Sequence, residues 1–201
     1  MSDLVESVDG RTARRERNRS LVLDAVIELF AEHRLLPTAP EVAARSGVSL
    51  RSVFRYYEDT DALVQAAMAR HLERVEPLFE IPGLGEGAFE DRVKRFTSNR
   101  IELYRTIAPT ARAALHRAPT SSIISERIRR ARLDGADALR AMFASELVVM
   151  TAARRRAVTA VADTLFQFEA LEHLFIDLEL SEGQATEALR HTLRSLLRPD
   201  G

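Results

Sequence analysis

The segment RSVFRYY at residues 51–57 places two arginines next to three aromatic residues. An arginine guanidinium can donate two hydrogen bonds to the acceptors that guanine presents in the major groove of DNA. An aromatic face can lie against the methyl group of thymine, and hydroxyls or helix N-termini can bind phosphate oxygens. These residue types are therefore typical of nucleic-acid recognition if a single helix or strand exposes them on one face.

The sequence around this segment predicts two short helices joined by a tight turn. Thr38 is a suitable N-cap for a helix over about 39–46. Gly47 follows that helix, where the left-handed conformation needed for a sharp turn is favourable only for glycine. Ser49 is a suitable N-cap for the next helix, over about 50–57.

Helical spacing then assigns the two faces of the second helix. Val53 and Tyr57 lie four residues apart and are predicted to be buried. The opposite face and its flanks carry Leu50, Arg51, Ser52, Phe54, Arg55 and Tyr56. This arrangement is typical of a helix-turn-helix that reads DNA, and the alternative is an ordinary helical hairpin with solvated arginines.

The distribution of charge favours DNA over the ordinary hairpin. Residues 11–57 hold nine arginines against five acidic residues, whereas the whole chain has a net charge of −1. A basic N-terminal part is therefore attached to an acidic remainder, as in a molecule with two functions.

Composition excludes several other classes of protein. The 201 residues are 46% hydrophobic and include no cysteine, which excludes disulfides and thiolate metal sites and indicates a cytoplasmic protein. No apolar run is long enough to span a membrane, and the N-terminus lacks the apolar stretch of a signal peptide.

Catalytic motifs are also missing. The five histidines show neither HxxxH nor HExxH spacing, and there is no phosphate-binding glycine loop and no GxSxG. We therefore expect no enzymatic activity, no cofactor and no metal site.

Periodicity predicts an all-α fold, with glycines and prolines at the boundaries and no sustained two-residue alternation. The loop-like segment EIPGLGEG, residues 80–87, is the predicted boundary between two domains. The predicted helices cover about 12–34, 39–46, 50–57, 61–79, 88–106, 109–117, 120–147, 150–178 and 182–197.

The stretch RNRSLVLDAVIELFAEHRLLPTAPEVAARSGVSLRSVFRYYEDTDALV resembles the N-terminal domain of TetR-family transcriptional regulators. The resemblance covers about residues 12–72, with the helix-turn-helix motif at about 38–57. It implies a DNA-binding domain there and a helical ligand-binding and dimerisation domain over 80–201. It further implies a repressor that binds a near-palindromic operator as a homodimer and is released by a small-molecule inducer.

Combined with the faces assigned above, the resemblance gives a set of DNA-contacting residues. The set is Arg14, Arg15, Arg17, Thr38, Ser49, Leu50, Arg51, Ser52, Phe54, Arg55, Tyr56 and Thr60. Three positions depart from the family pattern: Thr60 replaces a phosphate-binding lysine, Phe54 replaces a tyrosine and Tyr57 replaces a phenylalanine.

Apolar stripes in the C-terminal part predict a ligand pocket with a few polar groups. The candidate lining residues are Phe96, Arg100, Leu103, Tyr104, His116, Ile124, Ile128, Phe143 and Phe166. The alternative is that these stripes form an ordinary hydrophobic core.

The last two helices predict a dimer interface, as a four-helix arrangement formed by two copies. Its candidate residues are Phe168, Leu171, Phe175, Leu189, Leu193 and Leu196. The alternative is that they close the core of a single chain. Two further hypotheses remain open for the whole protein, namely an architectural protein with little sequence preference and a helical interaction module without DNA binding.

Overall fold

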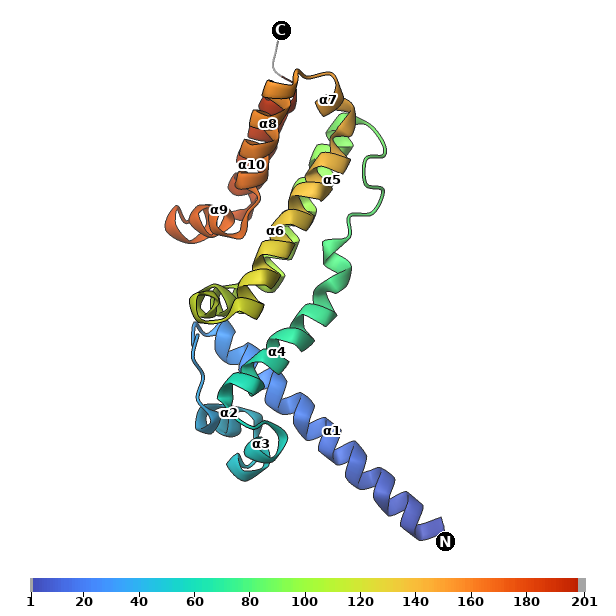
Figure 1. Ribbon diagram of the computed structural model, residues 1–201, viewed down its shortest axis with the longest axis vertical. Helices are drawn as coiled ribbons and strands as arrows, with labels where there is room; N and C mark the ends of the chain where they lie inside the picture. Colours follow the sequence, from blue (N-terminus) through green and yellow to red (C-terminus); the bar gives the residue numbers. More distant parts are fainter. Residues whose placement is uncertain (1, 199–201) are drawn as a thin grey trace. The chain divides into compact units, whose positions relative to one another are not determined.

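The computed structural model describes residues 2–198, with side chains from residue 12 onward, and within them every regular element is helical (Figure 1). The all-α prediction is therefore confirmed. The helices are α1 (Ser2–Ala31), α2 (Ala39–Ser46), α3 (Leu50–Tyr56), α4 (Thr60–Val75), α5 (Phe89–Arg117), α6 (Ser122–Met142), α7 (Ala144–Val148), α8 (Ala152–Leu165), α9 (Phe168–Glu172) and α10 (Glu182–Leu197). Shorter turns are the 3₁₀ helices η1 (Glu76–Phe79) and η2 (Ala118–Thr120) and the π-helical turn η3 (His173–Asp177).

The chain forms two compact units. The first unit contains the chain up to Arg74 together with Pro109–His116, and the second contains Val75–Ala108 and the chain from Arg117 onward. The domain limits expected from the sequence, 12–72 and 80–201, did not assign residues 109–116 to the first unit.

Helix α5 explains this difference. The sequence predicted a break before Pro109, but α5 continues through it to Arg117. A proline inside a helix costs about 3 kcal/mol because it removes one hydrogen bond and crowds the preceding turn. Burial of Ala108, Thr110 and Ala113 around it favours the continuous helix.

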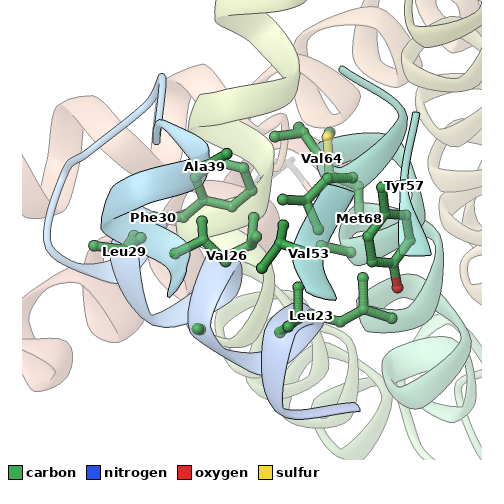
Figure 2. Close-up of a cluster of buried hydrophobic side chains, with 14 of the residues drawn as sticks. Leu23, Val26, Leu29, Phe30, Ala39, Val53, Tyr57, Val64 and Met68 are labelled. Atoms are coloured by element: carbon green, nitrogen blue, oxygen red, sulfur yellow. The ribbon is translucent and has the colours of Figure 1, made fainter. Parts of the chain in front are cut away.

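The first unit packs around a core contributed by α1 to α4 (Figure 2). Val26 and Phe30 of α1 are fully buried there, and Val53 and Tyr57 take the buried side of α3, as their spacing predicts. Helix α1 is longer at its start than predicted and ends at Ala31, because His33 adopts a left-handed φ of 61°. The recognition segment is thus anchored to the core of this unit by the buried side chains of Val53 and Tyr57.

The second unit has two clusters of buried side chains. Phe96 of α5 meets Phe143 and Phe166 edge-on, with ring centroids 5.6 and 5.0 Å away. Tyr104 stacks on Phe175 at 5.2 Å and donates a hydrogen bond from its hydroxyl to Glu172 at 2.6 Å. The helices predicted at 120–147 and 150–178 are both interrupted, the first at Phe143 and the second at Phe166, where these rings turn into the core.

A buried ion pair also joins two elements of the second unit. The guanidinium of Arg92 donates to Glu146 at 2.6 and 2.8 Å, to the carbonyl oxygen of Met142 at 2.6 Å and to that of Gly87 at 3.2 Å. Both charged side chains are almost fully buried, so α5 is fixed to α7 at this point. This pair could not be predicted from the sequence, because its two members are 54 residues apart in the chain.

Candidate nucleic-acid interface

Local capping positions the two helices of the motif. Thr38 and Glu41 form a reciprocal capping box at the start of α2, with the Thr38 amide donating to Glu41 at 2.8 Å. Gly47 ends α2 in the left-handed conformation, at φ 67°, and Val48 is buried in the corner. Ser49 then accepts the amide of Ser52 at 3.3 Å and starts α3. Each of these features agrees with the turn predicted from the sequence.

Helix α3 shows a continuous face of mixed chemistry to solvent. Leu50 is 39% exposed and Phe54 is 52% exposed, and the side chains of Arg51 and Arg55 are also exposed. Ser52 and Tyr56 lie half-buried at the flanks. All six residues predicted for this face therefore lie on it or beside it.

The two arginines of this face are not neutralised by carboxylates. Arg51 makes no hydrogen bond and no ion pair with any residue whose side chain the structure describes. Arg55 donates to the hydroxyl of its neighbour Tyr56 at 3.3 Å and lies 5.3 Å from the centroid of that ring. The hydrogen bond from Arg55 lowers the pKa of the Tyr56 phenol, which makes its hydroxyl a stronger donor to an anion.

Other arginines of the same unit are paired. Arg34 binds Glu41, Arg45 binds Glu32 at 2.8 Å, and Arg74 binds Asp24 at 3.1 Å. Pairing with an acidic side chain leaves little positive potential for a ligand. The free positive charge of the motif is therefore concentrated on α3.

The basic arm of the first unit consists of Arg14, Arg15 and Arg17, which were predicted to contact DNA. All three lie within α1 and are exposed. The charge of Arg15 acts on the Tyr56 phenol, so the arm and the end of α3 share one electrostatic environment. This segment is an extension of a helix rather than an irregular arm.

The start of α4 differs from what the sequence suggested. The Asp59 side chain accepts the amide of Ala62 at 2.7 Å and thereby caps the helix that begins at Thr60. The N-terminus of α4, next to Thr60, is thus already capped by a carboxylate.

None of the residues predicted to line a ligand pocket borders either of two surface cavities of the second unit. Phe96 and Phe143 are buried against each other, Arg100, Leu103, Tyr104 and Ile124 are also buried, and Ile128 and Phe166 are half-buried. His116 is exposed and belongs to the first unit.

Two surface cavities of the second unit are lined by other residues. One, of about 660 Å³, is bordered by α6, α7 and α8 and includes Arg155, Arg156 and Asp163. The other, of about 560 Å³, is bordered by α5 and α10 and includes Arg105 and Glu182, which form an ion pair.

The predicted dimer residues lie in the core of the single chain. Leu171, Leu189 and Leu193 are at most 2% exposed, and Leu196, Phe168 and Phe175 pack against the same clusters. A side chain buried within one chain cannot contact a partner, which argues against Leu171, Leu189 and Leu193 as interface residues. Phe168, Phe175 and Leu196 are half-buried, and their place in an interface stays a prediction. Apolar spacing identified the buried face of these helices, and the sequence held no signal to distinguish core from interface.

Comparison with known proteins agrees with this architecture. No protein-family model matches the chain, and no curated protein matches it. Among solved structures, the chain is similar to a candidate transcriptional regulator from Pseudomonas aeruginosa PAO1, with a TM-score of 0.66 and 18% sequence identity over 92% of each chain. The fold is therefore an all-helical one shared with that protein. None of the described helices is both long and apolar enough to cross a membrane.

Proposed function

We propose that this protein is a TetR-type transcriptional regulator, a repressor that binds a near-palindromic operator as a homodimer and is released by a small molecule. The observation that carries the proposal is the exposed face of α3, where Arg51 is unpaired while Arg34, Arg45 and Arg74 are bound to carboxylates. In this proposal α3 enters the major groove, with Arg51 directed at base edges and Arg55 and Tyr56 at phosphates.

Operator recognition needs two copies, because one helix reads too few bases to select a site in a genome. Helices α8 and α10 pack against each other, and each keeps an exposed stripe of small side chains. The stripe of α8 includes Ala153, Ala157 and Val161, and that of α10 includes Ala188 and Ser195. Small side chains allow helices of two copies to approach closely, so we assign the homodimer interface to these stripes.

A mobility-shift experiment tests the DNA-reading role. The probe is the DNA that flanks the protein's own coding region, and a random duplex of equal length serves as the non-specific probe. We expect Arg51→Ala to weaken binding to the specific site by about 1–3 kcal/mol while changing binding to random DNA little.

The matched control is Arg74→Ala, which removes an arginine of the same unit that is paired with Asp24. It should leave both affinities unchanged. Equal losses on specific and random DNA for Arg51→Ala would assign this residue to the phosphate backbone and favour an architectural protein.

A further inference from the structure

Arg100 of α5 is a buried arginine without a carboxylate partner. Its side chain is 8% exposed, and Nε and Nη2 both donate to the Asn99 side-chain oxygen, at 3.0 and 2.8 Å. The guanidinium also lies 5.6 Å from the ring of Phe96. Among the side chains that the structure describes, no carboxylate accepts a hydrogen bond from it, and Nη1 has no hydrogen-bond partner.

Arg92, two turns earlier on the same helix, shows what a fully satisfied buried arginine requires in this fold. Its guanidinium is held by both oxygens of Glu146 and by two backbone carbonyl oxygens. Arg100 is buried to nearly the same extent, yet it has one neutral amide oxygen instead. The second unit thus provides a carboxylate for the buried guanidinium of Arg92, but provides none for that of Arg100.

The surroundings of Arg100 leave one side of the guanidinium open to a small group. A Cβ atom placed on Gly135 of α6 would make an ordinary van der Waals contact with Nη1, at 3.9 Å, so the absence of a side chain there leaves room for about one methyl group beside this nitrogen. Thr97, three residues before Arg100 and on the same side of α5, is fully buried, and its hydroxyl has no hydrogen-bond partner. A second buried polar group therefore lacks a partner at this place.

The position of the guanidinium is fixed from behind. Asn99 accepts from Arg100 and donates from its own amide to the Leu78 carbonyl oxygen of η1 at 3.1 Å. Burial lowers the pKa of Arg100 to about 10, which still leaves it protonated at neutral pH. A charge held in this way is costly until an anion pairs with it.

The chemistry of the site selects the anion. One buried positive charge balances one negative charge, and the planar guanidinium fits a carboxylate. The buried ring of Phe96 makes the surroundings of the guanidinium apolar, which disfavours further polar groups on the ligand. A phosphate dianion would leave a buried negative charge unbalanced.

We propose that the ligand is an organic monocarboxylate with an apolar body, whose carboxylate pairs with Arg100 and accepts the hydroxyl of Thr97. This proposal rests on the proposed function, because it names the class of the small molecule that would release the operator. Arg100 is not among the residues that line the two surface cavities, so the ligand does not occupy either of them.

Thermal unfolding of the full chain without DNA tests the site directly. The probes are straight-chain carboxylates of four to about twelve carbons, benzoate and phenylacetate, each paired with its primary amide. We expect at least one carboxylate, at about 100 times its dissociation constant, to raise the Tm by about 5–10 °C. Its amide should have no effect, because it carries no charge for Arg100.

Two variants remove the need for an external anion. Arg100→Met should unfold at the same Tm as the parent or higher, and should lose the response to carboxylates. Gly135→Asp places a carboxylate beside Nη1, so it should raise the Tm and also abolish the response. The control is Arg105→Met, which removes an exposed arginine of the same helix that is paired with Glu182, and which should keep the response.

The outcomes separate this proposal from the proposed function. If no carboxylate of the panel raises the Tm, or if Arg100→Met still responds, the carboxylate site is overturned even where Arg51-dependent operator binding is observed. If carboxylates bind through Arg100 but operator affinity is unaffected by them, the site stands and the ligand-release part of the proposed function fails.

Discussion

At the scale of single residues, the second unit contains one buried arginine that is paired with a carboxylate and one that is not. Arg92 and Glu146 satisfy each other, and Arg92 lowers the pKa of the Glu146 carboxyl group through their hydrogen bonds. Arg100 has no such partner within the described side chains. The first arrangement serves stability, whereas we assign the second to ligand binding.

The Arg92–Glu146 pair predicts a dependence of stability on pH. Glu146→Gln leaves the buried Arg92 without a counter-charge and should lower the free energy of unfolding by about 3–5 kcal/mol at pH 7. Because the folded-state pKa of Glu146 is lowered, its contribution is present above the unfolded pKa of about 4.3 and is lost as the pH falls through the folded value. Urea unfolding at several pH values measures both effects.

The exposed pair Arg129–Glu126 provides a control for this experiment. Glu126→Gln should change the free energy of unfolding by less than about 1 kcal/mol at pH 7, because exposed ion pairs contribute little. The free energy of unfolding could also fall as steeply on acidification in Glu146→Gln as in the parent protein. That result would show that the Arg92–Glu146 pair is not the source of the pH dependence.

At the scale of elements, the recognition motif follows from short-range signals. Thr38, Gly47 and Ser49 each determine the conformation of their own neighbourhood, and the structure has the caps and the turn where the sequence predicts them. The sequence-based prediction did not include Asp59 as the residue that caps α4, although an aspartate just before a helix is a recognised capping signal. Local chemistry thus specifies most of the candidate DNA-reading surface.

The second unit could be predicted only in part, because its decisive contacts join distant residues. An apolar stripe such as Leu189 and Leu193 has the same spacing whether it faces its own chain or a partner. The pairing of Arg92 with Glu146, and the lack of a pair for Arg100, likewise depend on which helices become neighbours. Which side chains of the second unit are buried, and which of them are paired, could therefore be learned only from the structure.

The basic N-terminal part of α1 predicts a change in salt dependence. Changing Arg14, Arg15 and Arg17 to glutamine should lower the slope of log affinity against log salt by up to about three units per subunit, if each contacts a phosphate. Changing Arg127, Arg129 and Arg130 of α6, which are also exposed, alters the net charge equally and should leave the slope nearly unchanged. Titrations of operator binding at several salt concentrations measure the slopes, and equal slopes for the two triple variants would exclude a role for the arm.

At the scale of the whole molecule, the assembly of two copies decides whether the proposed function is possible. The interface assigned to α8 and α10 consists of exposed small residues, not of the buried leucines expected from the sequence. A stable dimer of this kind should bury on the order of 1,600 Å² or more of total surface.

Charging this surface should separate the two copies without unfolding either of them. We expect Ala157→Glu with Ala188→Glu to give a folded monomer with at least a tenfold loss of operator affinity, because the two charges enter the proposed interface of each copy. Gel filtration, circular dichroism and mobility shifts check the three parts of this prediction. Val149→Glu, at an 83% exposed position on the end of α7, is the control and should remain dimeric. A double variant that eluted as a dimer would place the interface elsewhere.

The assignment of residues 109–116 to the first unit has a consequence for how the protein is made. Ala113 is fully buried in the core that α1 to α4 build, so that core stays open until the ribosome has added the residues between Arg74 and Ala113. At roughly 5–20 residues per second, this delay lasts about 2–8 seconds. During that time the core of the growing chain lacks Ala113 and the adjoining Ala114. The N-terminal unit, although first in the sequence, is thus completed by a segment translated well after it, and the nascent protein depends on that segment to hide its apolar surface.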